Sequence, residues 1–257
     1  MLEIQGKGLV GQGQVCVLGP LEEHGLEGIY TAPDPGLKSL RAGCFLQEQR
    51  PLFQVLDKSW AIGADGSGCL RIFLRAREDV DLNRLIRLQS LRSGISLAWV
   101  TLSDKGAAGE RADKSGPLIE EMACRSMSIS LARGYVIPDD PQLLKALLIH
   151  LALVAGVDLI LTTGGTGVGP RDITPDVTAE VVDKRLPGFE RSMLAVSLQK
   201  TPHAAISRAV AGTLDESLII NLPGSPRAVR ENLECVLPAI EHALAKLQGD
   251  PAECGSG

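Results

Sequence analysis

The pattern of hydrophobic and polar positions changes near Gly94, which divides the chain into two parts. Up to about Ile72, short apolar runs are separated by glycine and proline, as in strands joined by turns. The segment Asp65–Gly68 between two apolar runs predicts a hairpin, and Asp34–Gly36, with its central proline, predicts a turn. Residues 1–80 are therefore predicted to form a small β-rich domain, either a barrel or a sandwich.

The segment that joins the two parts has a different period. Its apolar positions recur at the spacing of one helical face, and the pattern stops before the pair Ser93-Gly94. We therefore predict a linker helix over residues 81–94. The residues that share its expected face are Leu82, Leu85, Ile86 and Gln89.

After Gly94, buried apolar runs alternate with helical patterns, which predicts an α/β domain with a parallel sheet over residues 95–250. Strands are expected at residues 95–102, 134–138, 157–163 and 217–224. Helices are expected at residues 115–131, 141–154, 188–200 and 226–247. Ligands of such sheets bind beyond the carboxyl ends of the strands, so the loops that follow these strands form the candidate site.

The loop after the third of these strands is rich in glycine. Four glycines fall within six positions, at Gly164, Gly165, Gly167 and Gly169. Backbone amides at glycine can approach an anion with no Cβ in the way. A flexible turn is the alternative interpretation, but these glycines directly follow a buried strand and precede the pair Arg171-Asp172. Because neither a Walker A motif nor a GxGxxG helix start is present, we predict a phosphate-binding loop of another kind.

Two aspartates in the part after Gly94 indicate a possible cation site. Asp139 and Asp172 follow two different strands. If those strands pair, both carboxylates lie at the same edge of the sheet. Two carboxylates can hold Mg²⁺ while nucleotide phosphates complete its coordination. Asp139 could instead cap the helix that follows, although Asp140 suits the cap better because Pro141 would then occupy the first helical position. Ser225 is a similar candidate for a helix cap that also presents free amides to an anion.

Composition narrows the choice of function. Hydrophobic residues are 44% and charged residues 22% of the chain, as in globular proteins. Aromatic residues are 3% and the net charge is -5, which argues against nucleic acid as a partner. The sequence has no CxxC pair, no membrane span and no visible secretory signal, so we expect a cytoplasmic protein with reduced thiols and no membrane partner. The net acidity belongs to residues 95–257, so local geometry must hold any anionic ligand.

Several separated motifs together resemble one known family. They are TLSDKGAAGERADKSGP, IPDD, LTTGGTGVGPRDITPD, LPGFERSM and IINLPGSP, in this order, over about residues 95–247. The match is similar to the molybdopterin adenylyltransferases of the MogA/MoaB type, and the residues before Gly94 are not covered by it. The resemblance implies a three-layer α/β sandwich with a mostly parallel sheet, which assembles as a homotrimer.

The same resemblance implies an activity and a set of site residues. The activity is transfer of AMP from Mg-ATP to molybdopterin, with release of pyrophosphate, and a molybdenum insertase would receive the adenylylated product. Asp139 and Asp172 match the acidic pair of the family and are expected to bind Mg²⁺ and to be catalytic. The expected substrate and nucleotide-binding residues are Ser103, Asp104, Thr163, Gly164, Gly165, Thr166, Gly167, Gly224 and Ser225. Arg171 would either neutralise transferring phosphate or remain solvated.

Other functions remain open at the level of sequence. The same fold also serves molybdenum insertases and nicotinamide mononucleotide deamidases of the competence-damage type. A non-catalytic pterin carrier or scaffold would keep the binding surface without turnover. The part before Gly94 is either a stabilising domain or one with a delivery, docking or molybdate-related role, as in a degraded relative of the molybdenum cofactor sulfurase carboxy-terminal domain. Its Cys44 and Cys69 are either thiol ligands or small core residues.

Overall fold

The computed structural model of the protein describes residues 1–20, 29–31, 36–62 and 66–249. The chain divides into two compact units. The first unit contains Met1–Gly94 and Val154–Gly156, and the second contains Ile95–Leu153 and Val157–Gly257. The turn predicted around Pro35 falls mostly outside the described residues.

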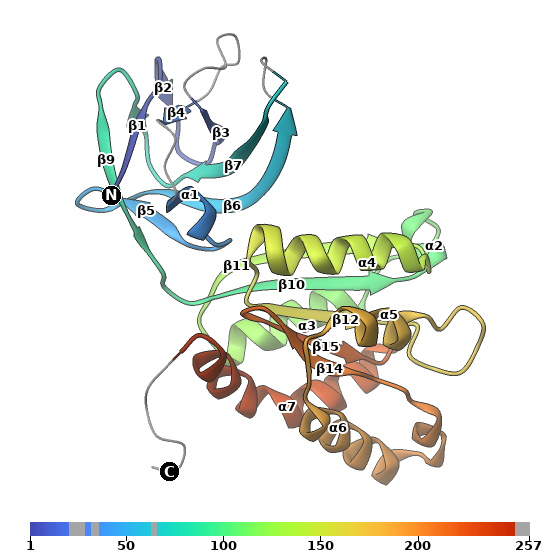
Figure 1. Cartoon of the computed structure of the whole chain (residues 1–257). Coiled ribbons are helices and arrows are strands. Elements are labelled where there is room, and N and C mark those ends of the chain that lie inside the picture. Colours follow the sequence, from blue (N-terminus) through green and yellow to red (C-terminus); the bar gives the residue numbers. More distant parts are fainter. Residues whose placement is uncertain (21–28, 32–35, 63–65, 250–257) are drawn as a thin grey trace. The chain divides into compact units, whose positions relative to one another are not determined.

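The first unit is a closed β-barrel with the strand order β1-β4-β3-β7-β6-β5-β9 (Figure 1). Its strands are β1 Leu2–Gln5, β3 Val15–Pro20, β4 Ile29–Thr31, β5 Phe45–Gln47, β6 Pro51–Ile62, β7 Gly68–Ala76 and β9 Ile86–Leu91. A separate ladder joins β2 (Leu9–Val10) to β8 (Val80–Asp81), and the short helix α1 spans Gly36–Ser39. Fully buried aliphatic and aromatic side chains such as Phe53 and Ile72 fill the interior, and Cys44 belongs to this core.

The hairpin predicted around Asp65–Gly68 is present, because β6 and β7 pair antiparallel up to Ile62 and Gly68. The linker helix predicted over residues 81–94 is wrong. Residues in this segment form β8 and β9, and β9 closes the barrel by pairing with β1 and β5. Ile86 and Leu88 are fully buried while Arg87 between them is exposed, which is the period of a strand. Closure of the barrel therefore outweighs the weak helical spacing.

The second unit contains a six-stranded mixed sheet with the order β11-β10-β12-β15-β14-β13. Its strands are β10 Ile95–Leu102, β11 Ile129–Ile137, β12 Leu159–Thr163, β13 Lys184–Arg185, β14 Ala211–Leu214 and β15 Ser217–Leu222. The pairs among β11, β10, β12 and β15 are parallel, whereas β14 and β13 add antiparallel pairs at one edge. The expected parallel sheet is thus present, with an antiparallel extension that the sequence did not predict.

Helices cover both faces of this sheet, with α4 and α5 on one face and α3 and α7 on the other (Figure 1). Every residue of β12 and β15 is buried, as expected for central parallel strands. The helical elements are α2 Asp104–Ala107, α3 Ser115–Ser126, α4 Pro141–Ile149, a π-helical turn His150–Ala155, α5 Thr174–Val181, α6 Pro187–Lys200, a 3₁₀ turn Pro202–Ile206 and α7 Pro226–Leu247. Among the described residues, none of these helices is both long enough and apolar enough to cross a membrane.

The boundary between α3 and β11 differs from the prediction. A helix was expected to extend through Leu131, but α3 ends at Ser126 and β11 begins at Ile129. Ile129 and Leu131 pair in parallel with the start of β10, so pairing along the edge of the sheet outweighs the local helical pattern. The strand predicted at residues 134–138 is therefore only the end of a longer one.

Gly134 of β11 provides a test of how the sheet packs. It lies opposite Trp99 in the ladder, and a Cβ at this position would collide with the indole ring. We expect Gly134→Ala to lower the free energy of unfolding by about 1–3 kcal/mol in urea denaturation, as for overpacking of a filled core. Gly188→Ala in α6 is the matched control, because a Cβ there meets no atom within 4 Å. Equal stability of the two variants would contradict this packing.

Candidate functional site

Hydrogen bonds tie together the loops that follow β10, β11, β12 and β15. The amide of Ser103 donates to the carbonyl of Ile137 at 2.9 Å, which joins the ends of β10 and β11. The amide of Gly164 donates to the carbonyl of Leu222 at 3.3 Å, which joins the ends of β12 and β15. The carboxyl ends of four parallel strands therefore meet at one edge, where ligands of such sheets bind.

Side chains and a close backbone contact reinforce the junction between β12 and β15. The Thr163 hydroxyl donates to the carbonyl of Pro223 at 2.6 Å, and the Ser115 hydroxyl donates to the carbonyl of Gly224 at 3.0 Å. A Cβ on Gly224 would lie 3.3 Å from the Cα of Gly164, so the two loops approach closely. Gly164 also has a φ of +99°, which only glycine adopts readily. The Thr163 side chain, expected at the ligand, is thus used to hold the site together.

Four successive carbonyl groups of the glycine loop accept hydrogen bonds. Thr174 serves the first two, because its hydroxyl donates to Gly164 at 2.8 Å and its amide donates to Gly165 at 3.1 Å. Arg208 serves the next two, because its amide donates to Thr166 at 3.0 Å and its Nε donates to Gly167 at 2.7 Å. The carbonyl side of this loop is therefore fully bonded to the protein.

The amides that share these four peptide units behave differently. In the described part of the chain, the amides of Gly165, Thr166, Gly167 and Val168 donate no hydrogen bond. Consecutive backbone amides that point the same way can bind an anion. The loop therefore offers backbone donors, and phosphate binding by it stays a prediction.

Asp172 follows the amide row and is held by the next glycine in the loop, Gly169. Its Oδ2 accepts a hydrogen bond from the amide of Gly169 at 2.8 Å. A Cβ on Gly167 or on Gly169 would lie 2.8 or 3.0 Å from this oxygen, so the two glycines leave the space that the carboxylate occupies. The glycines therefore serve both the anion-binding amides and the placement of Asp172.

Asp139 lies at the same edge of the sheet as Asp172. Burial raises the pKa of the Asp139 carboxyl, and the negative charge of Asp172 raises this pKa further. The direct pairing of their strands that we considered is not present, since β10 lies between β11 and β12. The long loop after β12 spans this gap, because Asp172 lies well beyond Thr163 at the end of the strand. The two carboxylates are therefore close enough to interact although their strands are not neighbours.

Asp104 supports Asp139. Its Oδ1 accepts a hydrogen bond from the Asp139 amide at 3.0 Å, and its carboxylate forms an ion pair with Arg171. The Arg171 side chain is 69% exposed beside this ion pair, and neutralisation of a phosphate by Arg171 stays a prediction. Asp140 caps α4 by accepting from the Leu143 amide at 2.9 Å, which leaves the Asp139 carboxylate available.

Two expected binding residues also act as helix caps. The Ser103 hydroxyl accepts a hydrogen bond from the Gly106 amide at 3.1 Å, and the Ser225 hydroxyl accepts one from the Ala228 amide at 3.3 Å. The cap at Ser225 agrees with the alternative that the sequence offered. Both hydroxyls thus fix the loops, whereas the backbone of these loops remains at the edge of the site.

Arg208 is the residue that sequence reasoning missed. Besides the carbonyls of the glycine loop, its guanidinium bonds the carbonyl of Asp172 at 2.5 Å and both carboxylate oxygens of Asp176 at 2.7 and 3.0 Å. It lies outside every strand-end loop, in the segment between the 3₁₀ turn and β14. No local pattern distinguishes it from an ordinary surface arginine.

Asp139 and Asp172 have the chemistry to bind a cation that is also coordinated by a substrate. Among the described residues, no group of three or more histidine, cysteine, aspartate or glutamate side chains could hold a metal ion. Asp139 and Asp172 supply two carboxylates, and within the same residues no donor contacts the Asp139 carboxylate. This donor set fits Mg²⁺, which is commonly bound through one or two carboxylates together with substrate phosphates and water.

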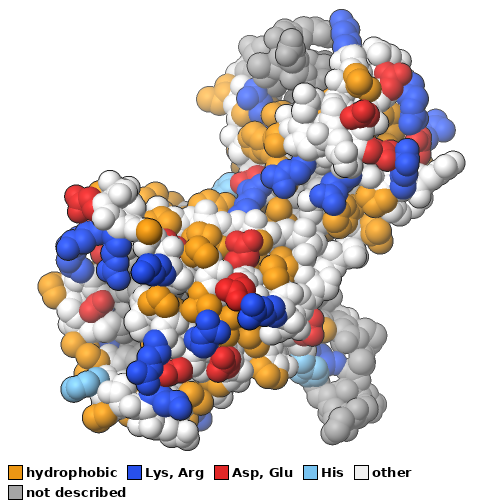
Figure 2. All heavy atoms as spheres, turned by 180° about the vertical axis from the view of Figure 1, so that it is seen from behind, with side chains coloured by type: hydrophobic (Ala, Val, Ile, Leu, Met, Phe, Trp, Pro, Cys, Tyr) orange, Lys and Arg blue, Asp and Glu red, His pale blue; other side chains and the backbone are white. Residues whose placement is uncertain are grey.

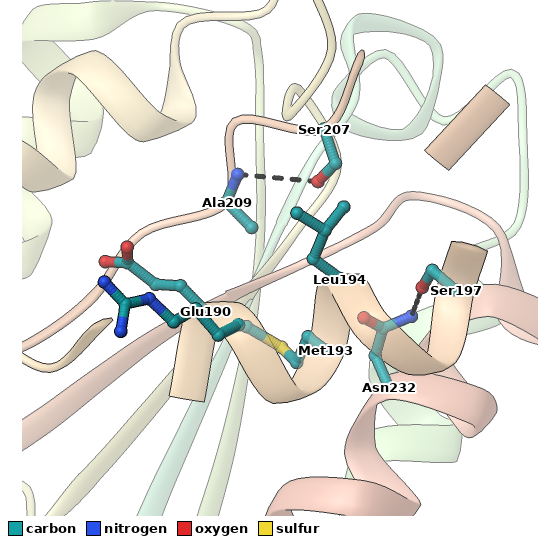
Figure 3. A pocket seen from close by; sticks show the side chains of 8 residues that line it. Glu190, Met193, Leu194, Ser197, Ser207, Ala209 and Asn232 are labelled. Carbon is teal, nitrogen blue, oxygen red and sulfur yellow. Dashed lines mark hydrogen bonds between the residues drawn. The ribbon is translucent and has the colours of Figure 1, made fainter. Parts of the chain in front are cut away.

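A separate pocket of about 190 Å³ lies between α6, α7 and the residues before β14 (Figure 3). Met193 and Leu194 line it from α6, and Asn232 donates to the Ser197 hydroxyl at 2.9 Å on its polar side. None of the strand-end residues discussed above lines this pocket. Figure 2 shows one face of the molecule, on which acidic and basic side chains are interspersed.

The link between the two carboxylates can be measured directly. We expect Asp172→Asn to lower the pKa of Asp139, because the replacement removes a nearby negative charge, while burial keeps this pKa above its usual range. Carboxyl titration by NMR measures the shift. The exposed cap residue Asp140 provides the control, since Asp140→Asn retains a good helix cap. An Asp139 pKa that is the same in wild type and Asp172→Asn would contradict a shared site.

The raised pKa also predicts a change in stability. A carboxyl with a raised pKa in the folded state contributes stability at a pH below its unfolded pKa of about 3.9, and this contribution is lost as the pH rises through the folded pKa. Asp139→Asn should therefore be more stable than wild type in urea denaturation at neutral pH, and the difference should shrink below about pH 4. A constant difference at all pH values would exclude titration of Asp139 as its cause.

Known proteins match the second unit and the site that it carries. A family model described as "Probable molybdopterin binding domain" matches residues 98–242. The molybdopterin adenylyltransferase of Helicobacter pylori J99 is 40% identical over 157 residues, which are 61% of this chain and 89% of that protein. Gephyrin of Dictyostelium discoideum is 42% identical over 161 residues, but this chain spans only 22% of its length.

Solved structures agree with this match. The molybdopterin biosynthesis enzyme MoaB from Thermus thermophilus is 45% identical, with a TM-score of 0.56 over 61% of this chain and 98% of that structure. The tungsten cofactor synthesizing protein MoaB from Pyrococcus furiosus is 34% identical, with a TM-score of 0.54 over 62% of this chain and 99% of that structure. The matched region contains both aspartates, the glycine loop and Arg208. The chain therefore belongs, through its second unit, to the family of probable molybdopterin-binding domains.

Proposed function

We propose that this protein transfers AMP from Mg-ATP to molybdopterin in the biosynthesis of the molybdenum cofactor. The observation that carries the proposal is the row of four amides at Gly165–Val168, which have no partner among the described residues and are suited to phosphate oxygens. Relatives named molybdopterin adenylyltransferase, at 37–40% identity over about 60% of the chain, support the choice of this reaction.

The proposed reaction is a displacement at phosphorus. An oxygen of the molybdopterin phosphate attacks the α-phosphorus of ATP, the bond from that phosphorus to its bridging oxygen breaks, and pyrophosphate leaves with the electron pair. Because both reactants are anions, positioning and neutralisation of charge supply most of the catalysis. The free amides are donors that need no reorganisation during the step.

Asp139 and Asp172 would hold Mg²⁺, in keeping with their shared edge and the donor-free carboxylate of Asp139. The cation, when bound, supplies positive charge to the phosphate oxygens. Asp104 holds the Asp139 backbone and is paired with Arg171, so we assign it a positioning role. The Gly224 and Ser225 backbone borders the same edge and is proposed to line the nucleotide site.

A molybdenum insertase is the proposed partner that receives the product. Gephyrin and the "Molybdenum cofactor biosynthesis bifunctional protein" of Chlorobaculum tepidum contain the matched region as 22% and 48% of longer chains. In those relatives a segment similar to this chain is joined to further sequence. We therefore infer that the second unit acts next to a later enzyme of the same pathway.

We also propose a homotrimer, formed in part through α6. This helix has 14 residues, and Met193 is its only buried one among the described residues. Leu194 and Leu198 on α6 are 37% and 46% exposed, and Ile206 of the adjoining 3₁₀ turn is 55% exposed. Apolar side chains gathered on one element mark a surface for protein contacts.

The role of Asp172 is tested by turnover. Asp172→Ala should keep the fold but reduce molybdopterin-dependent release of pyrophosphate from ATP by at least about 100-fold, because charge stabilisation at the reacting phosphate is lost. Glu180→Gln is the control, since Glu180 pairs with Lys145 on the surface. Full turnover by Asp172→Ala would refute its assignment. Wild-type protein that binds molybdopterin but releases no pyrophosphate would instead be a carrier.

The trimer is tested by sedimentation. Leu198→Asp should shift the wild-type trimer towards monomers, because a charged carboxylate would be buried against a neighbouring copy. Leu9→Asp in the first unit is the control, since Leu9 is 66% exposed and lies on the separate ladder β2-β8. A monomeric wild type, or a Leu198→Asp variant that stays trimeric, would contradict an interface at α6.

A further inference from the structure

The backbone of the glycine loop is oriented by two residues that lie outside it. Thr174 and Arg208 bond the carbonyls of Gly164–Gly167, and the amides of Gly165–Val168 are left without a partner among the described residues. Each bonded carbonyl shares a peptide unit with one of these amides. Arg208 reaches the loop from 41 positions along the chain at Gly167, so the loop sequence alone does not determine its own orientation.

We propose that Arg208 is a positioning residue whose side chain turns the amide of Val168 towards bound phosphate, while its backbone amide holds the preceding peptide at Thr166. This inference rests on the proposed function. A trans peptide unit is planar, and its carbonyl and amide point in opposite directions. The described residues contain no cis peptide bond. Because the carbonyls of Thr166 and Gly167 point to Arg208, the amides of Gly167 and Val168 point away from it.

Arg208 also fixes the backbone of the carboxylate that is assigned to Mg²⁺. Its Nη2 donates to the carbonyl of Asp172, whereas the Asp172 side chain accepts from Gly169. One guanidinium therefore holds both ends of the loop, at Gly167 and at Asp172. This side chain therefore helps to set the spacing between the amide row and the carboxylate, together with the bonds between Gly169 and Asp172.

Asp176 sets the direction of the guanidinium. Nη1 of Arg208 bonds both oxygens of the Asp176 carboxylate, which leaves Nε and Nη2 for the two loop carbonyls. Only arginine carries several donors in one rigid plane, so lysine can replace one of these bonds but not all of them. The arrangement therefore requires arginine specifically.

The test uses two readouts of the loop. The first is the affinity for Mg-ATP by calorimetry, and the second is hydrogen exchange at the amides of Gly169 and Asp172, which are bonded within the loop. Arg208→Ala should weaken Mg-ATP binding at least 10-fold and speed this exchange, with the exchange of α7 amides unchanged. Arg208→Lys should give intermediate values because it restores one carbonyl bond.

Matched variants separate positioning from general damage. Arg227→Ala is the control, because Arg227 is an exposed arginine whose one partner among the described residues is Glu231 on α7. Thr174→Val should also weaken Mg-ATP binding, and Thr174→Ser, which keeps the hydroxyl that bonds Gly164, should restore it. If Arg208→Ala does not fold, Arg208→Lys decides by the same measurements.

The outcomes distinguish this inference from the proposed function. Wild-type affinity for Mg-ATP in Arg208→Ala, or unchanged exchange at Gly169 and Asp172, would overturn the role of Arg208. If wild-type protein itself does not bind Mg-ATP, the proposed function fails. In that case faster exchange in Arg208→Ala would still support the control of loop geometry, and unchanged exchange would refute it.

Discussion

The site depends on the orientation of four successive peptide units in the glycine loop. Their carbonyls accept hydrogen bonds from the protein, whereas their amides have no partner among the described residues. The planar peptide forces its carbonyl and its amide to opposite sides. Thr174 and Arg208 take the carbonyls of Gly164–Gly167. The amides on the other side are thereby left without a protein partner among the described residues, and the proposed phosphate binding would use them in place of a basic surface.

This orientation relies on the sheet beneath it. The buried strands β12 and β15 end together, and the bond from Gly164 to Leu222 fixes where the loop begins. A Cβ on Gly224 would lie 3.3 Å from the Cα of Gly164, and a Cβ on Gly164 would lie 2.6 Å from the carbonyl oxygen of Leu102. Asp172 and Asp139 then come to the same edge from opposite sides of β10, where burial and the charge of Asp172 raise the pKa of Asp139.

Much of the fold could be predicted from the sequence, because long apolar patterns mark the strands and helices that bury the most surface. The strand Ile95–Leu102 and the helix Pro226–Leu247 were predicted at their observed bounds, since both have long unbroken patterns. The segment 81–94 was predicted wrongly because its few apolar residues fit two periods, and only the pairing of β9 with β1 selects the strand. The start of β11 depends likewise on a neighbour that is distant in sequence. Contacts of this kind have no local signature.

In the candidate site, too, features set by local sequence could be predicted, and features set by distant contacts could not. Glycines and aspartates were predictable, because their chemistry is local: a missing Cβ, a capping carboxylate, a charge at a strand end. The direction of each peptide is not local, since it is set by whichever donor reaches the carbonyl. Arg208 bonds Asp172 and Gly167, which lie 36 and 41 positions away in sequence. The residues around Arg208 contain no pattern that predicts these contacts. A motif can therefore specify which amides are able to bind phosphate, while a residue outside the motif decides which way they face.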